Sequence, residues 1–298
     1  MGTVIKSSSV SINGAFSAIE ITQRAASQCI AKAGIDKNEI NLLIYTGVYR
    51  DDNIAEPAMA PLVQKRLGMN LDPVNRGSLD RTTFSFDINN GECGFLSAVS
   101  VADAAFRAGS AKYALILSGD AHPSKRYHPD FPYALVGSAV LLAYEPERES
   151  GFRDVLVKTN GIEKTGLTSI LHYKEFGVKG REMSRIDMEE DYHEELYKIA
   201  VEAIREYCTA DSVKLSDIDV LLTSQQYAGL GGRISRSIGL NETSRVVDMH
   251  DLYGDPHTSA LPLGYHHLSE RGELIKNERI LFVAAGSGLT ASCSMYVV

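Results

Sequence analysis

The sequence has no tryptophan, only four cysteines, no run of Lys or Arg and no long uninterrupted apolar stretch. The cysteines lie far apart, without a CxxC pair or a Cys/His ligand spacing, so neither a disulfide-stapled scaffold nor a structural zinc site is expected. The most apolar segment, 280–298, is diluted by Gly, Ser and Thr and is typical of two core strands rather than a membrane span. We therefore predict neither a metal site nor a bound cofactor.

What is present describes an ordinary globular protein of 298 residues, 44% of them apolar and 23% charged. This length suggests two domains or one two-lobed unit. The formal net charge of −8 argues against nucleic-acid binding and against attraction to anionic membranes. The first twenty residues lack a continuous apolar region, so a secretory signal is not expected and we predict a cytoplasmic protein.

An internal repeat organises the chain. Residues 16–47 and 192–223 each give an amphipathic helix, a polar turn and an apolar strand. In both halves there follow a helix with a Gly stop, a short β-rich segment ending in an acid, a helix of small residues, and two apolar strands. The small-residue helices are 93–109 and 257–272. Two copies of one βα unit are thus predicted, at 1–148 and 149–298.

Alternating strands and helices indicate an α/β fold with parallel or mixed sheets covered by helices. Two such units packed about a pseudo-twofold axis would give five layers, with the two small-residue helices at the centre. The alternative is two separate α/β lobes that flank a cleft.

The central helices also supply the candidate chemistry. Cys93 begins the first of them, where free backbone N–H groups and the helix dipole would stabilise a thiolate and lower its pKa. His257 has the equivalent place in the second half, so the two side chains could form a Cys/His pair. Taken singly, a cysteine of this kind is more often an inert core residue and a histidine after proline a turn residue.

At this point the sequence resembles the thiolase-fold condensing enzymes, and most closely their β-ketoacyl-acyl-carrier-protein synthase III branch. The similarity extends over residues 25–298, and the segment around Cys93 is its most specific part. The motifs that carry it are AGIDKNEINLLIYTG, APLVQKRLG, FDINNGECGFLSAVSVADAAFRAGSAKYALILSGD, VGSAVLLA, SDIDVLL, YGDPHTSA and LFVAAGSGLT. The resemblance implies the five-layered α-β-α-β-α thiolase fold.

The resemblance also implies site roles and partners. Cys93 matches the acylated nucleophile, and the backbone N–H groups of Cys93 and Ser287 match the oxyanion hole. The substrate would be an acyl thioester on acyl-carrier protein or coenzyme A. A homodimer is implied, or a heterodimer with a related synthase.

The departures from the family are as informative. Ser224, Gln225, Gln226 and Tyr227 replace the family's His-Gln-Ala-Asn, so the usual catalytic histidine is Ser224. His257 replaces the family's Asn, after an insertion at Asp255 and Pro256. Family members also carry roughly fifty more residues before the first helix, by alignment of the repeat, including a coenzyme A clamp.

Three functions remain open. The first is an acyltransferase or atypical condensing enzyme of fatty-acid or secondary-metabolite synthesis, with an acyl-Cys93 intermediate and His257 as general base. The second is a non-catalytic partner subunit of a heterodimeric condensing enzyme. The third is a thioester hydrolase. The irregular segment 121–133 is interpreted as a metal loop, a lid or a dimer loop, and the segment 159–185 as an acyl-chain cap or a linker.

Overall fold

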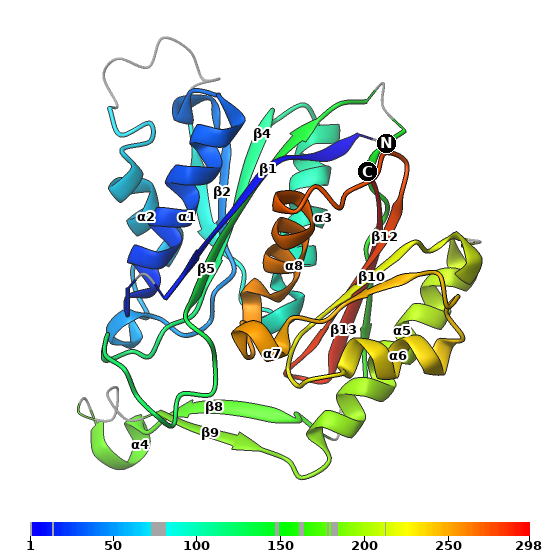
Figure 1. Ribbon diagram of the computed structural model, residues 1–298. Helices are drawn as coiled ribbons and strands as arrows, with labels where there is room; N and C mark the ends of the chain where they lie inside the picture. The colour runs from blue at the N-terminus through cyan, green and yellow to red at the C-terminus, as the bar shows by residue number, and fades with distance from the viewer. Residues whose placement is uncertain are drawn as a thin grey trace.

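The computed structural model describes residues 2–298 apart from 14, 73–81, 147–148, 161–163, 178, 180–183 and 212. Two large mixed sheets stand side by side, each covered by helices (Figure 1). The first sheet has the strand order β1-β5-β4-β2-β3. Its strands are β1 (Thr3–Ile12), β2 (Leu42–Tyr45), β3 (Phe84–Asp87), β4 (Tyr113–Gly119) and β5 (Val136–Tyr144).

The second sheet repeats this arrangement in the order β11-β10-β12-β13-β6, with β7 also paired to β13. Its strands are β6 (Gly151–Phe152), β7 (Leu156–Thr159), β10 (Val220–Thr223), β11 (Arg245–Val247), β12 (Arg279–Gly286) and β13 (Thr290–Val297). In each sheet three strands are parallel (β3, β2, β4 and β11, β10, β12) and the next strand, β5 or β13, is antiparallel. The predicted internal repeat is therefore present in the strand order.

Three hydrophobic clusters define the layers. The helices α1 (Ala18–Ala33) and α2 (Met59–Leu67) pack on the outer face of the first sheet, and α5 (Tyr192–Ala210) and α6 (Leu230–Ile238) on the outer face of the second. The third cluster joins both sheets through the helices α3 (Gly94–Arg107) and α8 (Ala260–Glu270). The result is the five-layered thiolase fold, and the alternative of two separate lobes is wrong.

Local sequence explains how the outer helices begin and end. Ser17 caps α1 by accepting the N–H of Glu20, and Gly34 ends it in the left-handed conformation that glycine adopts without a steric penalty. The same kind of ending recurs at Gly68 after α2 and at Gly239 after α6. The middle helix α3 is rich in Gly, Ala and Ser, which lets it pack closely between the sheets.

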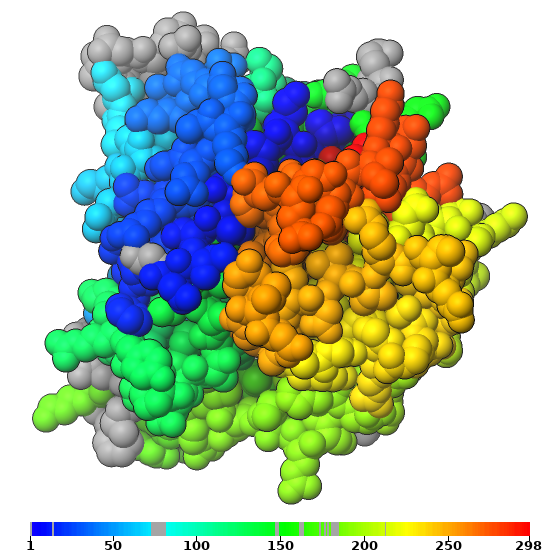
Figure 2. Space-filling view, in the orientation of Figure 1, coloured from blue at the N-terminus to red at the C-terminus, as the bar shows by residue number. Residues whose placement is uncertain are grey.

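The first strand was not predicted from the sequence. β1 pairs antiparallel with β5, and five residues join it to α1. It also contacts the second half, since Ser8 Oγ lies 3.0 Å from Nδ1 of His266 on α8. In the space-filling view the orange segment with α7 (His250–Tyr253) and α8 directly abuts the blue N-terminal segment (Figure 2).

The strands of the two large sheets come from separate parts of the sequence. The strands of the first lie between residues 3 and 144, and those of the second between 151 and 297. Whether 1–148 and 149–298 are separate domains stays a prediction.

A small third sheet lies beside the two large ones. It consists of β8 (Leu167–Leu171) and β9 (Ser184–Met188), which pair antiparallel, with the short helix α4 (Tyr173–Phe176) between them (Figure 1). The segment 159–185, interpreted as a cap or a linker, thus contains ordered strands, although 161–163, 178 and 180–183 lie outside the described residues. In the part of the chain that the structure describes, no helix is both long and apolar enough to cross a bilayer.

Candidate functional site

The site lies where two equivalent 3₁₀ turns meet. The turn η3 (Gly91–Cys93) leads into α3, and the turn η6 (His257–Ser259) leads into α8. Both first residues have positive φ, +48° at Gly91 and +47° at His257. His257 is therefore the counterpart of Gly91, not of Cys93 as the sequence suggested, because each helix proper begins three residues later.

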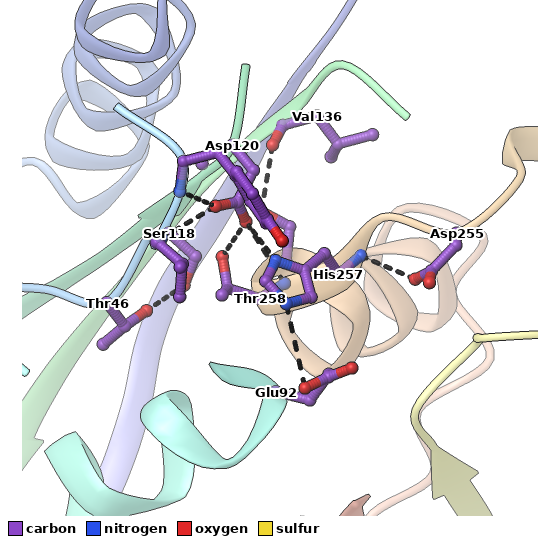
Figure 3. A network of polar contacts seen from close by, with 12 residues as sticks. Thr46, Glu92, Ser118, Asp120, Val136, Asp255, His257 and Thr258 are labelled. Carbon is purple, nitrogen blue, oxygen red and sulfur yellow. Dashed lines mark hydrogen bonds and ion pairs between the residues drawn. The ribbon is translucent and has the colours of Figure 1, made fainter. Parts of the chain in front are cut away.

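His257 is held by a buried carboxylate from the first half of the chain. Asp120, directly after β4, accepts the N–H groups of Val48 and Tyr49 at Oδ1, at 2.7 and 2.8 Å. Its Oδ2 lies 3.0 Å from His257 Nδ1 and accepts the hydroxyl of Thr258 at 2.6 Å (Figure 3). The orientation of the imidazole is thus fixed, and Nε2 is the ring nitrogen that could exchange a proton with a substrate.

Two further contacts lock the histidine in place. Its own N–H donates to Asp255 Oδ1 at 2.8 Å, which supports the left-handed backbone that a side chain rarely adopts. The ring stacks on Tyr133, with centroids 4.2 Å apart and planes 25° from parallel. The insertion at Asp255 and Pro256 therefore contributes directly to the position of His257.

Glu92 faces this imidazole. Its Oε2 lies 3.8 Å from His257 Nε2, and both side chains are 4% exposed (Figure 3). The carboxylate packs so tightly on the end of β12 that a Cβ at Gly286 would lie 1.9 Å from Oε2. Glu92 Oε1 accepts a hydrogen bond from Gln226 Nε2 at 3.1 Å, whereas Oε2 is buried without a hydrogen-bond donor among the described residues.

A cavity of about 600 Å³ opens over Glu92. Its walls come from η3, from the segment after β4, from β8 and β9, and from α5 and the loop before α8. The lining residues are Glu92, Asp130, Pro132, Tyr133, Leu167, Ile186, Met188, Tyr192, His193, Gln226, His250, Gly254 and Asp255. This volume is typical of a small-molecule site.

The charges in the site are strongly coupled. Burial opposes protonation of His257, but the carboxylates of Asp120 and Glu92 outweigh it and raise its pKa to about 9. Burial favours the neutral form of Asp120, yet His257 and the hydrogen bond from Thr258 hold its pKa below the usual value. Burial raises the pKa of Asp255 to about 7. At neutral pH His257 is therefore an imidazolium paired with the Asp120 carboxylate.

Cys93 does not have the environment that the sequence led us to expect. Its thiol is fully buried in the central core and donates to the carbonyl of Thr290 at 3.4 Å. Burial raises its pKa to about 12, so the prediction of a stabilised thiolate is wrong. Among the described residues that line the cavity, Glu92 is present, whereas Cys93, like His257 and Ser287, is not. Glu92 and Cys93 face different sides because successive side chains of a 3₁₀ turn point about 120° apart.

The expected oxyanion hole is only partly in place. The N–H of Cys93 donates to the carbonyl of Asn90 at 3.0 Å and so is already used within the turn. Ser287 follows β12 and lies against η3, since a Cβ at Gly91 would be 3.1 Å from its Oγ and 4.0 Å from its backbone nitrogen. The role of Ser287 as a backbone donor stays a prediction.

The residues that replace the family's His-Gln-Ala-Asn have mainly structural contacts. Ser224 bridges β10 to β12, with its hydroxyl donating to the carbonyl of Ala285 and accepting its N–H. Gln225 donates to the carbonyls of Thr223 and Val247. Tyr227 packs edge-on against His193, and only Gln226 of this group lines the cavity.

Sequence reasoning missed the residues that the structure places around His257. Glu92 adjoins the residue that was selected, and Asp120 ends the strand segment ALILSGD, where a carboxylate at the end of a buried strand is itself a signal. The rings of His122 and His128 stack with their centroids 4.4 Å apart. Both lie in the segment 121–133, for which a metal loop was one interpretation. No metal-ligating cluster occurs among the described residues.

Comparison with known proteins agrees with this fold. Residues 208–298 match the family described as 3-oxoacyl-[acyl-carrier-protein] synthase III, C-terminal. The β-ketoacyl-[acyl-carrier-protein] synthase III of Clostridium perfringens is 25% identical over 281 residues, covering 91% of this chain and 82% of the relative. The enzyme of the same name from Coxiella burnetii is 27% identical over 275 residues, covering 89% and 79%.

Solved structures give the same answer for the fold. The 3-oxoacyl-(acyl carrier protein) synthase III of Pseudomonas aeruginosa superposes with a TM-score of 0.84 at 17% identity, covering 100% of this chain and 98% of its own. That of Aquifex aeolicus superposes with a TM-score of 0.76 at 18% identity, covering 100% of both chains. With the two halves, the central helices and the sequence relatives taken together, the chain has the thiolase fold and is similar to the β-ketoacyl-acyl-carrier-protein synthase III-like branch of the condensing enzymes, whose C-terminal family model matches residues 208–298.

Proposed function

We propose that this protein is an acyltransferase that acts on acyl thioesters of coenzyme A or acyl-carrier protein, with Glu92 as the general base. The observation that carries the proposal is Glu92, a residue of the cavity wall whose buried Oε2 lacks a hydrogen-bond donor among the described residues and faces His257 Nε2. A carboxylate of this kind can accept a proton from an acyl acceptor.

The reaction follows from the charges of the site. Glu92 takes a proton from the acceptor, whose freed lone pair attacks the thioester carbonyl. The tetrahedral oxyanion is stabilised by the imidazolium and by the Ser287 N–H. When the C–S bond breaks, His257 gives its Nε2 proton to the leaving thiolate, and the proton on Glu92 then replaces it. With water as acceptor the products are a carboxylic acid and a thiol, which is the hydrolase reaction.

An acyl-Cys93 intermediate is the competing route. It requires the thiol to leave its contact with the Thr290 carbonyl, to ionise despite a pKa near 12 and to reach the cavity. The burial of Cys93 therefore favours the Glu92 route.

A non-catalytic partner subunit is the second candidate function. It is favoured by the structural role of Ser224, which leaves the family's histidine position without a group that can transfer a proton at neutral pH. Homodimerisation or pairing with a related synthase stays a prediction.

The test measures thiol release and acyl products from acyl-coenzyme A and acyl-carrier-protein thioesters of increasing chain length. We expect Glu92→Gln to lower kcat/KM by about 100-fold or more, the scale of a lost general base, and Cys93→Ala to change it by less than about threefold. Glu202→Gln, an exposed charge-matched control on α5, should behave like the unaltered protein.

Intact-mass spectrometry separates the alternatives. Acyl mass on the unaltered protein that disappears in Cys93→Ala would replace the Glu92 route by the acyl-cysteine route. Absence of both turnover and acyl mass with every thioester, for the protein alone, would favour the partner-subunit function.

A further inference from the structure

Two residues of the cavity wall each carry a buried acceptor atom that has no donor among the described residues. Glu92 Oε2 and Gln226 Oε1 are both inaccessible to solvent and without a hydrogen-bond partner among the described residues. A buried acceptor left unpaired is unfavourable, so each is a place where a ligand donor would be favoured. Both residues line the same cavity.

The orientation of the Gln226 amide is fixed by its neighbours. Its Nε2 donates both to Glu92 Oε1 and to the carbonyl of Ala285, and each of these partners is an acceptor. The nitrogen therefore occupies that end of the amide, and Oε1 is the atom that remains unpaired. The two free acceptors belong to side chains that are hydrogen-bonded to each other.

The described residues of the cavity wall include acidic side chains but no Lys or Arg. The acids are Glu92, Asp130 and Asp255, of which Asp255 is partly protonated at neutral pH because burial raises its pKa to about 7. His193 does not compensate, because burial lowers its pKa and favours the neutral imidazole. An anionic acceptor such as a carboxylate or phosphate would be repelled here, whereas a cation with N–H donors would be attracted.

The remainder of the wall is suited to an apolar body. Leu167 of β8, with Ile186 and Met188 of β9, lies on one side, and Tyr133 and Tyr192 supply aromatic faces. Aromatic faces also attract ammonium groups through their negative quadrupole.

We propose that the acyl acceptor of this site is a primary amine with an apolar body, whose ammonium group donates to Glu92 Oε2 and Gln226 Oε1. This inference rests on the proposed function. Glu92 takes one proton from the ammonium, and the free amine attacks the thioester carbonyl. As the C–S bond breaks, a second nitrogen proton passes through His257 to the thiolate. The products are an amide, a free thiol and one proton released to solvent.

Binding is measured first, without any thioester, by calorimetry with n-hexylamine, and with hexan-1-ol and hexanoate as probes of equal length. We expect the amine to bind at least tenfold more tightly than either other probe. Glu92→Gln should weaken amine binding about tenfold and leave hexanol binding unchanged, whereas the control Glu202→Gln should affect neither. Equal affinity for amine and hexanol, or amine binding that Glu92→Gln does not weaken, would overturn the inference.

Acyl transfer is then followed with an acyl thioester and hexylamine together, by mass spectrometry of the products. Formation of N-hexyl amide at a rate that falls in Glu92→Gln supports the amine as acceptor. Release of free acid with no amide would leave the proposed function standing and overturn the amine acceptor. Tighter binding of pantetheine than of the amine, lost in Glu92→Gln, would assign the two acceptors to the amide groups of the thioester donor instead.

Discussion

Glu92 Oε2 lies 3.8 Å from His257 Nε2, and the next residue, Cys93, contacts the Thr290 carbonyl in the central core. The cavity is thus lined by a carboxylate where the sequence suggested a thiol. Because Asp120 holds the other ring nitrogen, the imidazole is placed between two acids contributed by the first half of the chain.

Gly286 provides a test of the Glu92 position that leaves every polar group of the site unchanged. A Cβ at residue 286 would lie 1.9 Å from Glu92 Oε2, so Gly286→Ala must displace the carboxylate. We expect thioester turnover to fall by about tenfold or more, the scale of a misplaced catalytic group, with the fold retained. Gly232→Ala is the control, because its Cβ would meet only the flexible end of Arg236, at 3.5 Å. Equal activity of the two variants would contradict the role of Glu92.

Asp120→Asn tests the origin of the histidine charge. The amide can still accept the N–H groups of Val48 and Tyr49, but the negative charge beside the imidazole is lost. We expect the pKa of His257, measured by NMR titration of its ring protons, to fall well below 9, because burial then prevails. Asp154→Asn at an exposed acid should leave this pKa unchanged. An unaltered pKa in Asp120→Asn would show that Asp120 does not hold the charge.

Stability should decrease as pH rises. The pKa of His257 is raised from 6.5 to about 9 in the folded state, so its contribution is complete below pH 6.5 and is lost as pH rises through 9. At about 1.36 kcal/mol per pKa unit, this contribution is of the order of 3 kcal/mol. Asp255, raised from 3.8 to about 7, acts in the same direction between those values.

The measurement is thermal unfolding between pH 6 and pH 9.5. We expect a falling Tm whose slope above pH 7 is greatly reduced in His257→Asn, whatever the absolute stability of that variant. A Tm that rises over this range, or an equal slope in the variant, would contradict the assignment.

Thiol labelling reports the burial of Cys93 directly. Burial raises the pKa of all three thiols, to about 11 at Cys29 and about 12 at Cys93, but Cys208 is only half-buried whereas Cys29 and Cys93 are fully buried. We expect iodoacetamide at pH 8 to modify Cys208 first and Cys93 only upon unfolding, as read by peptide mass spectrometry. Cys208→Ser is the control for signal from the reactive site. Rapid native-state labelling of Cys93 would favour the acyl-cysteine route.

The sequence predicted the layered fold because the repeat leaves periodic traces. Amphipathic helices and apolar strands recur at matching places in both halves, and glycines end α1, α2 and α6. Each of these features depends on neighbouring residues in the sequence and can therefore be recognised without the structure. β1 was missed because its sequence, TVIKSSSVSI, is rich in serine and has no regular alternation of apolar and polar residues. Its pairing with β5 and its contact with α8 decide its conformation, and both are long-range.

The sequence selected Cys93 and His257, whereas the proposed reactive group, Glu92, is the residue before Cys93. His257, also selected from the sequence, lies between the side chains of Asp120 and Glu92. Cys93 was selected because a cysteine before a helix is the familiar nucleophile, and the 3₁₀ turn that precedes α3 cannot be distinguished from the first turn of the helix by sequence pattern alone. Asp120, 137 positions from His257, reaches it only through the packing of the two halves.

The turn η3 gives this chain a short mutational route to a different chemistry. Position 92 already supplies the orientation, the imidazolium neighbour and the open space, so that Glu92→Cys would put a thiol beside a positive charge, where thiolates are stabilised. The identity of one side chain on the turn, rather than the architecture around it, would then decide between proton transfer and covalent acyl capture. The surrounding fold could thus accommodate either a carboxylate or a thiol at position 92.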